Sequence, residues 1–275
     1  DIIIFIKKIM DRIKFFCVTN KEVNFLEKEN YKLCWVGSGE PPKKYLRCDN
    51  KINIYNKEKY YSELTFHYWY WKNILPNEND NQWIGFCQKR RYWINCENAT
   101  VVNKENINQH LYEYAPENWE QFDVILCKPL SVSGVKKSKI LKRGFKNFLR
   151  EPSILFDENK QNLFLHFDMH HGYGNLQKAI NVMAEKDKIQ FENFMRKNTS
   201  FNPHIMFISK PKVMNLWFEN LFEWLEKCEK QFKFQDLKGY DTQRLLAYLS
   251  ERYLSYWFQK NFKCKEVNWV QLDNF

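Results

Sequence analysis

Three consecutive cations, Lys89, Arg90 and Arg91, come one residue after a short apolar run in the segment WIGFCQKRRYWIN, which begins at Trp83. The apolar run is typical of a buried strand. The guanidinium group of arginine presents a planar fork of donors that matches phosphate oxygens. In a parallel α/β sheet, ligands bind at the carboxyl ends of the strands, so these cations are expected to face a ligand crevice. A diphosphate is therefore favoured over an isolated carboxylate, and the alternative is an ordinary pair of surface arginines.

A second group of chemically active side chains lies in HFDMHHGYGNL, residues 166–176, which holds three of the six histidines. Imidazole and carboxylate groups at this density can ligate a metal or act as a general base. No downstream segment has a standard zinc spacing. Asp168 and His170 are therefore the first candidates for a general base, and surface histidines in a glycine-containing loop are the alternative.

Two helical patterns carry further polar side chains. Glu63 and Thr65 lie at the start of SELTFHYWYWKN, where side chains reach a crevice; a capping role for Ser62 or Glu63 is the alternative. In the pattern that begins at Asp241, charged residues stand among leucines, which usually indicates a structural ion pair. Glu251, in this pattern, is the second candidate for a catalytic carboxylate.

The segment 128–150 contains eight cations and no acid. A solvated face is one interpretation. A surface for anionic lipid headgroups or for a phosphorylated acceptor is the functional interpretation, and nucleic acid is a third.

Alternating strands and helices must position these residues. β-branched and aromatic apolar runs predict strands at 13–18, 32–36, 83–87, 123–127 and 204–208. Helical spacing predicts helices over 62–75, 174–196, 211–232 and 241–260, the last with Asp241 as its N-cap. This alternation predicts an α/β fold with a mostly parallel central sheet. Because no internal repeat or low-complexity linker occurs, a single domain over 10–275 is the simplest partition.

Composition narrows the classes of function. The 275 residues carry a formal net charge of +10, which favours partners that bear phosphate: nucleic acid, nucleotides or an anionic membrane surface. The motifs of P-loop enzymes, dinucleotide enzymes and G-x-S-x-G hydrolases do not occur. The eight cysteines include no C-x-x-C pair and are expected to be reduced core residues.

The start of the chain is interpreted as an extension over residues 1–9, because Met10 would be a natural first residue. The apolar stretch there is interrupted by Lys7 and Lys8 and is too short to span a bilayer. No signal-peptide cleavage site follows it. We expect a cytoplasmic protein, with peripheral contact to the inner face of the plasma membrane as a further expectation.

Several motifs occur in order along the chain. They are IKFFCVTNK at 13–21, ELT at 63–65, YWYWKN at 68–73, IGFCQKRRY at 84–92, DVILCK at 123–128, HIMFISK at 204–210 and RLLAYLSERYL at 244–254. In this order they resemble a bacterial family, labelled a domain of unknown function, of capsular and exopolysaccharide glycosyltransferases. The His-Tyr pair that this family usually has before the arginines is Gln88-Lys89 here, so any role of that histidine is lost or moved. Residues 131–165 match no motif, as expected of a part that contacts a variable acceptor.

The resemblance implies a GT-A-like fold, with one Rossmann-like domain that binds a nucleotide sugar. It implies a UDP-linked donor and, as acceptor, a growing capsular or lipopolysaccharide glycan on a lipid carrier. The diphosphate is expected near Arg90 and Arg91. The remaining donor-pocket residues are expected to be Thr19, Asn53, Glu63 and Thr65, and the acceptor contacts His171, His204 and Arg244.

Glycosyl transfer needs the charge of the leaving diphosphate to be stabilised by a metal or by cations. Most GT-A enzymes use a D-x-D pair to hold Mn or Mg, but Asp80 precedes the predicted strand and is badly placed for this role. We therefore expect no tightly bound cofactor, with Mn or Mg as the metals to test, and cations that replace part of the metal's role. The rival readings are a transferase of another nucleotide-activated group in capsule modification, a binding-only member of the family, and a basic nucleic-acid-binding protein. Nucleic acid is not the partner that we expect.

Overall fold

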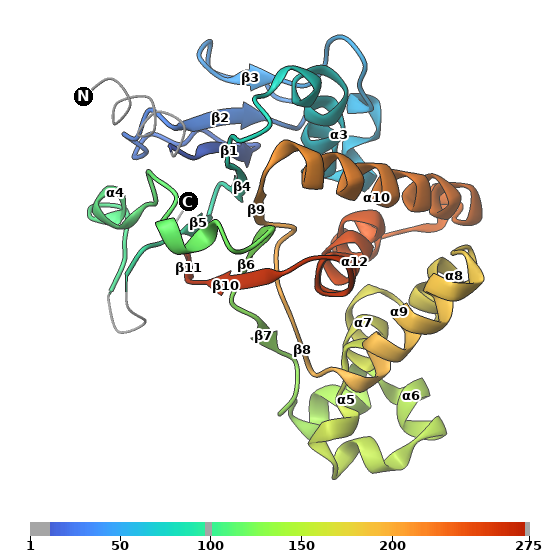
Figure 1. Ribbon diagram of the computed structural model, residues 1–275. Coiled ribbons are helices and arrows are strands. Elements are labelled where there is room, and N and C mark those ends of the chain that lie inside the picture. Colours follow the sequence, from blue (N-terminus) through green and yellow to red (C-terminus); the bar gives the residue numbers. More distant parts are fainter. Residues whose placement is uncertain (1–11, 97–100, 273–275) are drawn as a thin grey trace. The chain divides into compact units, whose positions relative to one another are not determined.

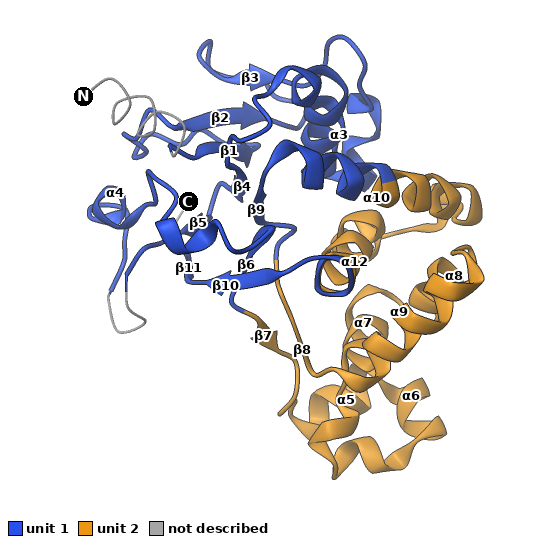
Figure 2. Cartoon of the chain, in the orientation of Figure 1, with its two compact units in different colours: residues 1–128, 204–219, 258–275 blue, residues 129–203, 220–257 orange. Residues whose placement is uncertain are grey.

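The structure is a computed structural model that describes residues 12–96 and 101–272 (Figure 1). The expected extension over residues 1–9 lies outside the described residues. By its contacts the chain divides into two compact units (Figure 2). Unit 1 comprises residues 1–128, 204–219 and 258–275, and unit 2 comprises residues 129–203 and 220–257. This division concerns compactness and not independent folding, so a single domain over 10–275 stays a prediction.

Unit 1 is built on a nine-stranded mixed sheet with the strand order β10-β6-β9-β4-β1-β2-β3, to which β5 and β11 are joined through β4. The parallel pairs are β1 with β2, β1 with β4, β2 with β3, and β6 with β10. The strands are β1 (Lys14–Thr19), β2 (Tyr31–Trp35), β3 (Leu46–Arg47), β4 (Ile84–Gln88), β5 (Arg91–Trp93), β6 (Val124–Cys127), β9 (Phe207–Ser209), β10 (Cys264–Val267) and β11 (Trp269–Gln271). The predicted α/β fold with a mostly parallel central sheet is confirmed.

One predicted strand differs in extent and direction. The strand expected at 204–208 is β9, which starts at Phe207 and runs antiparallel to β4 and β6. His204 and Ile205 have positive φ angles of 76° and 53°, which lie outside the β region and delay the start of the strand.

Alternation along β1 shows why this strand lies at the centre of the sheet. Phe15 and Cys17 belong to a core cluster with Tyr92 and other residues of the sheet and its loops. Phe16 points to the other face and packs against Phe66 and Tyr70 of helix α3 (Leu64–Asn73), with ring centroids 5.9 and 4.7 Å away. Both faces are therefore covered, as parallel sheets require.

Helices fill the intervals between the strands and make up most of unit 2. Those not yet given are α2 (Glu58–Tyr61), α4 (Ile107–His110), α5 (Lys137–Arg143), α6 (Phe145–Arg150), α7 (Leu163–His171), α8 (Asn175–Asn181), α9 (Glu185–Lys197), α10 (Pro211–Gln231), α11 (Tyr240–Gln243) and α12 (Leu245–Asn261). Unit 2 also contains a small antiparallel pair, β7 (Leu130–Ser131) with β8 (Ser200–Phe201). None of the described helices is both long and apolar enough to cross a membrane.

Two helix predictions are corrected. The helix predicted over 174–196 is two helices, because Ala184 adopts an extended conformation with ψ of 144° between them. Asp241 was expected as an N-cap, but it lies inside the short helix α11, and the long helix begins at Leu245. Gly239, with φ of 85°, starts this turn two residues before Asp241.

Gly85 has no room for a side chain. A Cβ atom there would lie 2.6 Å from Cε1 of Phe15 and 3.0 Å from Cγ1 of Ile208. We expect Gly85→Ala to lower the free energy of unfolding by about 1–3 kcal/mol, because overpacking a core forces its side chains off their preferred geometry. Denaturant unfolding measures the change. A double-mutant cycle with Phe15→Leu should show strong coupling between the two sites. If the two changes in unfolding free energy simply add, the predicted clash is contradicted.

The buried His67 makes stability depend on pH. Its side chain is 2 % exposed, its ring centroid lies 4.3 Å from that of Phe86, and its Nδ1 atom is buried without a hydrogen-bond partner. Burial lowers the pKa of His67 to about 3, against roughly 6.5 in an unfolded chain. Between these values only the unfolded state takes up the proton, so stability is lost as the pH falls below about 6.5.

We expect His67→Leu to reduce the loss of unfolding free energy between pH 6.5 and pH 5 by about 2 kcal/mol, the contribution of one proton over this interval. Denaturant unfolding at the two pH values checks this. His110→Leu is the control, and equal pH dependence in both variants would show that His67 is not the group responsible.

Candidate functional site

The sheet has a topological switch point between β1 and β4. From β1 the chain continues to β2 and β3 on one side, and β4 then returns to the other side of β1. Ligands of open α/β sheets bind outside the carboxyl ends of the strands at such a point. The segments that follow β1 and β4 are linked by Lys89, whose Nζ donates to Oδ1 of Asn20 at 2.5 Å.

The cations at this point form the tip of a β-hairpin. Gln88 of β4 pairs with Arg91 of the antiparallel strand β5, so Lys89 and Arg90 are the two residues of the turn. The hairpin is tied to the sheet, because Tyr92 donates its hydroxyl to the Lys89 carbonyl at 2.6 Å and Leu272 donates its backbone N–H to the Arg90 carbonyl at 2.8 Å. The Nε atom of Arg90 is buried and has no hydrogen-bond partner. An anionic oxygen would satisfy such a donor.

Gln88 connects the hairpin to two other segments of unit 1. Its Nε2 donates to Oε1 of Glu63 and to the backbone carbonyl of His204, both at 2.7 Å. Its Oε1 accepts from NH1 of Arg91, also at 2.7 Å. Because a carboxylate and a carbonyl accept and a guanidinium donates, the orientation of the amide is fixed by its partners. Gln88 therefore holds Arg91 in one direction, and we call these four groups the Gln88 network.

Backbone strain is concentrated around this network. Among the described residues, the non-glycine residues with positive φ are Lys51, Ser62, His204 and Ile205. Ser62 directly precedes Glu63, and His204 supplies the carbonyl that Gln88 binds. Ile205 is β-branched, for which a positive φ is a clear outlier. Strain of this kind occurs preferentially at functional sites.

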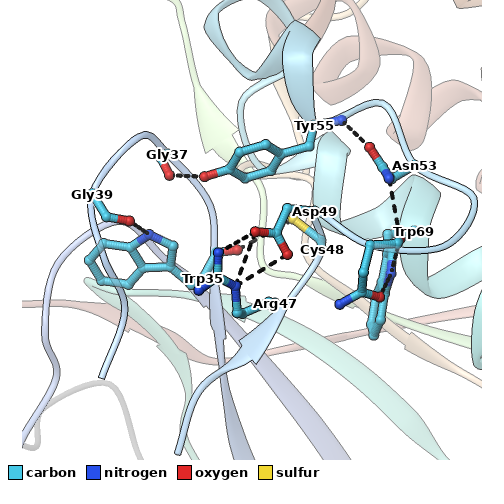
Figure 3. Close-up of polar contacts among 10 residues, drawn as sticks. Trp35, Gly37, Gly39, Arg47, Cys48, Asp49, Asn53, Tyr55 and Trp69 are labelled. Carbon is cyan, nitrogen blue, oxygen red and sulfur yellow. Dashed lines mark hydrogen bonds and ion pairs between the residues drawn. The ribbon is translucent and has the colours of Figure 1, made fainter. Parts of the chain in front are cut away.

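The carboxyl ends of β2 and β3 lie at the same edge of the sheet, because these strands run parallel to β1, and Figure 3 shows the polar contacts that follow them. The guanidinium of Arg47 is paired with the carboxylate of Asp49, and its hydrogen bonds lower the pKa of that carboxyl group. The hydroxyl of Tyr55 donates to the carbonyl of Gly37. Gly37 has φ of 102°, and a Cβ atom there would lie 3.3 Å from Cβ of Asn20. A side chain at this position would therefore be strained in the backbone and crowded against the end of β1.

Three of the expected donor-pocket residues hold loops at this edge. The Thr19 hydroxyl bonds both the N–H and the carbonyl of Lys21. Asn53 donates to the carbonyls of Asn50 and Lys51 and accepts from the N–H of Tyr55. Thr65 is fully buried and donates to the carbonyl of Ser62. These three side chains position the segments that carry Asn20 and Glu63, because their polar atoms form hydrogen bonds with the local backbone.

Glu63 is at the N-cap position of α3, but its side chain makes no capping hydrogen bond. Its carboxylate accepts from Gln88 instead.

His204 belongs to unit 1, where its ring lies edge-on to Trp269 with centroids 4.6 Å apart.

The remaining candidates lie in unit 2, mostly on helix α7. Asp168 is 5 % exposed; its carboxylate accepts from Nδ2 of Asn147 at 2.9 Å and from the N–H of Gly174 at 3.0 Å. Burial raises the pKa of Asp168, while these hydrogen bonds act in the opposite direction. Asp168 lines a cavity of about 290 Å³, with Lys142, Arg143, Phe145, Lys146, Asn147, Met169, Gly172 and Tyr173 as its other lining residues.

His170 lines a second cavity of unit 2, of about 340 Å³, which shares Arg143 and Met169 with the first. Its Nδ1 lies 2.9 Å from the carbonyl of His166. Because a carbonyl only accepts, Nδ1 carries the proton and Nε2 keeps its lone pair. Burial lowers the pKa of His170, so the ring is neutral at pH 7 and is able to act as a base.

Glu251 is the counter-ion of a buried arginine. Its Oε2 accepts from NH1 of Arg252 at 2.6 Å, and the Arg252 side chain is 2 % exposed. NH2 of Arg252 lies 3.2 Å from Nδ1 of His166, and burial together with Arg252 lowers the pKa of this histidine to about 2. The structural ion pair that was the alternative for this helix is present.

The two acceptor candidates of unit 2 lie next to α11. Nδ1 of His171 lies 3.0 Å from the carbonyl of Asp241, and its ring stacks on Tyr248 at 3.8 Å. Cζ of Arg244 lies 4.7 Å from the centre of the Tyr240 ring.

Few carboxylates lie at the β1–β4 edge among the residues that the structure describes. Among the described residues, no three His, Cys, Asp or Glu side chains form a group that could hold a metal ion. The carboxylates along this edge, Glu63 and Asp49, each accept from a nitrogen donor of a neighbour. Asp80 precedes β4 and is therefore at the amino end of that strand.

Fold and site together define an α/β protein with a mostly parallel sheet and a cationic hairpin at the switch point. The chain belongs to the family described as Domain of unknown function (DUF4422), which matches residues 14–262. Among solved structures it is similar to the WbbM bifunctional glycosyltransferase in its apo form, with a TM-score of 0.66 and 20 % sequence identity. That match covers 96 % of this chain but 46 % of the other, so the chain spans less than half of that protein's length. No curated protein matches the chain.

Proposed function

We propose that this protein is a glycosyltransferase that moves a sugar from a UDP-linked donor to a growing capsular or lipopolysaccharide glycan on a lipid carrier. The observation that carries the proposal is the hairpin turn Lys89–Arg90 with Arg91 behind it, at the carboxyl end of β4 and beside β1. The fold it shares with a protein described as a bifunctional glycosyltransferase supports the same class of activity.

The chemical task of this hairpin is to stabilise the leaving nucleoside diphosphate. Negative charge develops on the diphosphate as the glycosidic bond breaks, and preorganised cations stabilise it without reorganising at the moment of reaction. Arg91 is preorganised by Gln88, which is itself held by Glu63 and by the carbonyl of His204. The orphaned Nε of Arg90 is a second donor for the diphosphate oxygens.

A base must take the proton from the acceptor hydroxyl. Asp168 and His170 are our first candidates and Glu251 is the second. We favour Asp168 and His170 because each lines a cavity of unit 2. Glu251 is committed to Arg252.

Because cations rather than carboxylates gather at the hairpin, we expect transfer activity to persist in EDTA. Arg90 and Arg91 would then supply the charge stabilisation that Mn or Mg supplies elsewhere. Initial rates measured with EDTA, and with EDTA followed by excess Mn, test this. Full loss in EDTA with recovery by Mn would contradict it.

A thermal-shift screen of the purified protein against UDP, GDP, CMP, CDP and dTDP, each with and without Mn, tests the proposed function. A ligand that binds only the native state stabilises it by mass action, by about 2.7 kcal/mol at a concentration of 100 times Kd. We expect a rise in Tm with UDP that is lost in Arg90→Ala and Arg91→Ala. A shift with another nucleotide instead would favour transfer of a different nucleotide-activated group. No shift with any nucleotide, together with tight binding of an oligonucleotide, would favour the nucleic-acid reading.

A further inference from the structure

The helix pair α5–α6 of unit 2 has an inner face and an outer face of different character. Ile140 of α5 and Phe148 of α6 belong to a small core cluster with Leu165 and Met169 of α7. Three other apolar side chains of the pair, and Phe156 just after it, are exposed. Leu141 is 42 % exposed, Phe145 52 %, Leu149 63 % and Phe156 78 %. We call these four side chains the α5–α6 outer face.

This concentration of exposed apolar surface is unusual within the molecule. The described residues include eleven exposed large hydrophobic side chains, and four of them lie within these sixteen positions, 141–156. Phe145 and Leu149 are four positions apart within α6 and therefore share one face of that helix, whereas Leu141 lies on α5. Apolar side chains grouped in this way mark an interaction surface rather than ordinary surface variation.

Cations surround the outer face. Between Lys136 and Arg150 there are seven exposed cations and no acid. They are Lys136, Lys137, Lys139, Lys142, Arg143, Lys146 and Arg150. Nζ of Lys137 lies 4.6 Å from the centre of the Phe156 ring, so charge and apolar surface are in direct contact. The nearest acid along the chain, Glu151, is paired with Lys160 at 2.7 Å.

We propose that the α5–α6 outer face binds the surface of an anionic lipid bilayer. The four apolar side chains would enter the boundary between headgroups and acyl chains, and the cations would lie among the lipid phosphates. Basic amphipathic helices bind membranes in this way, through buried apolar area together with attraction to anionic lipids. This inference concerns unit 2 and does not rest on glycosyl transfer.

The composition of the face argues against the other occupants. A second copy of this chain would bring seven cations against seven cations, and like charges repel at an interface. Nucleic acid would use the cations and would find stacking surfaces in Phe145 and Phe156, but Leu141 and Leu149 offer it neither stacking nor a hydrogen bond. An anionic bilayer would interact with both the apolar side chains and the cations of the face.

Vesicle flotation with the purified full chain tests the proposal. Vesicles of phosphatidylcholine alone are compared with vesicles that also contain phosphatidylglycerol, at low and high salt. We expect binding to the anionic vesicles only, weakened at high salt because surface attraction is screened. Equal binding to both kinds of vesicle, or binding to neither, would overturn the proposal.

Two independent variants separate the contributions of the face. The first is Leu141→Ser with Phe145→Ser and Leu149→Ser, and the second is Lys137→Gln with Lys142→Gln and Lys146→Gln. Each basic residue near an anionic surface contributes roughly a factor of five to binding, so the second variant should bind about 100-fold more weakly. The first should also lose most of its binding, because apolar insertion is removed.

Matched controls come from exposed positions elsewhere in unit 2. Ile189→Ser removes an apolar side chain that is 55 % exposed, and Lys178→Gln with Lys186→Gln and Lys197→Gln makes the same change in net charge. Both controls should bind like the wild type. If the controls lose as much binding as the two test variants, or if the serine variant binds normally, the outer face is not the docking surface. Loss of self-association in the serine variant, with no vesicle binding by the wild type, would assign the face to a second copy.

Discussion

Replacing Arg91 with alanine is expected to lower kcat for sugar transfer by about 10²–10³-fold, the usual cost of removing one preorganised donor that stabilises developing charge. The loss should be in kcat more than in KM, because the charge on the diphosphate grows as the bond to the sugar breaks. Arg91→Lys should recover only part of the rate, since an ammonium group lacks the planar fork of a guanidinium. Steady-state kinetics with a UDP-sugar measures all three proteins.

Two further variants give this prediction its controls. Arg12→Ala removes an arginine just before β1, at the amino end of that strand, and should leave the rate unchanged. Gln88→Leu keeps Arg91 but removes the groups that orient it, so it should lower kcat by a smaller factor. If Arg91→Ala transfers sugar at the wild-type rate while Tm is also unchanged, the hairpin is not the site of the diphosphate.

The hairpin shows how far the sequence could predict this site. The residue types and their position after an apolar strand were sufficient to predict a cationic strand end, because the hydrophobicity and the charge of a segment follow from its residue types alone. The turn was not predicted. Lys89-Arg90 is not one of the Asn-Gly or Gly-containing pairs that indicate a two-residue hairpin. The strand β5 that completes it has three residues, too few for a periodic pattern to be recognised.

Gln88 was noticed in the sequence only as a departure from a family pattern. Its importance depends on contacts with Glu63, 25 positions earlier, and with the carbonyl of His204, 116 positions later. No local rule relates residues at such separations. The positive φ angles of Ser62, His204 and Ile205 were equally hidden, because none of these residues is glycine or asparagine, which would indicate such a conformation.

The helices were predicted well where the helical spacing of apolar residues stays within one helix, as in α3 and α10, and less well where that spacing continues across a break in the backbone. Leu176 and Ile180 of α8 and Phe191 and Met195 of α9 are all buried, so the apolar pattern continues across the extended residue Ala184. Periodicity reports which side chains face a core, and it does not report where the backbone leaves the helix.

Replacing Asp168 with asparagine is expected to lower kcat by about 10²–10⁴-fold, the range for loss of a general base, if this carboxylate takes the acceptor proton. The variant keeps the size of the side chain, so the free energy of unfolding should fall by only about 1 kcal/mol, the cost of weakening one hydrogen bond. Burial raises the pKa of Asp168, so the wild-type rate should rise with pH as the carboxyl group loses its proton. That rising limb should be absent in the variant.

Glu251→Gln is the comparison that separates catalysis from stability. It leaves the guanidinium of Arg252, which is 2 % exposed, without a counter-ion, and breaking a buried ion pair typically costs about 3–5 kcal/mol. We therefore expect Glu251→Gln to lower Tm strongly while the folded fraction keeps its kcat, and Asp168→Asn to do the reverse. A loss of kcat in Glu251→Gln with unchanged Tm would move the base to Glu251, since a carboxylate that only balances Arg252 has no part in proton transfer.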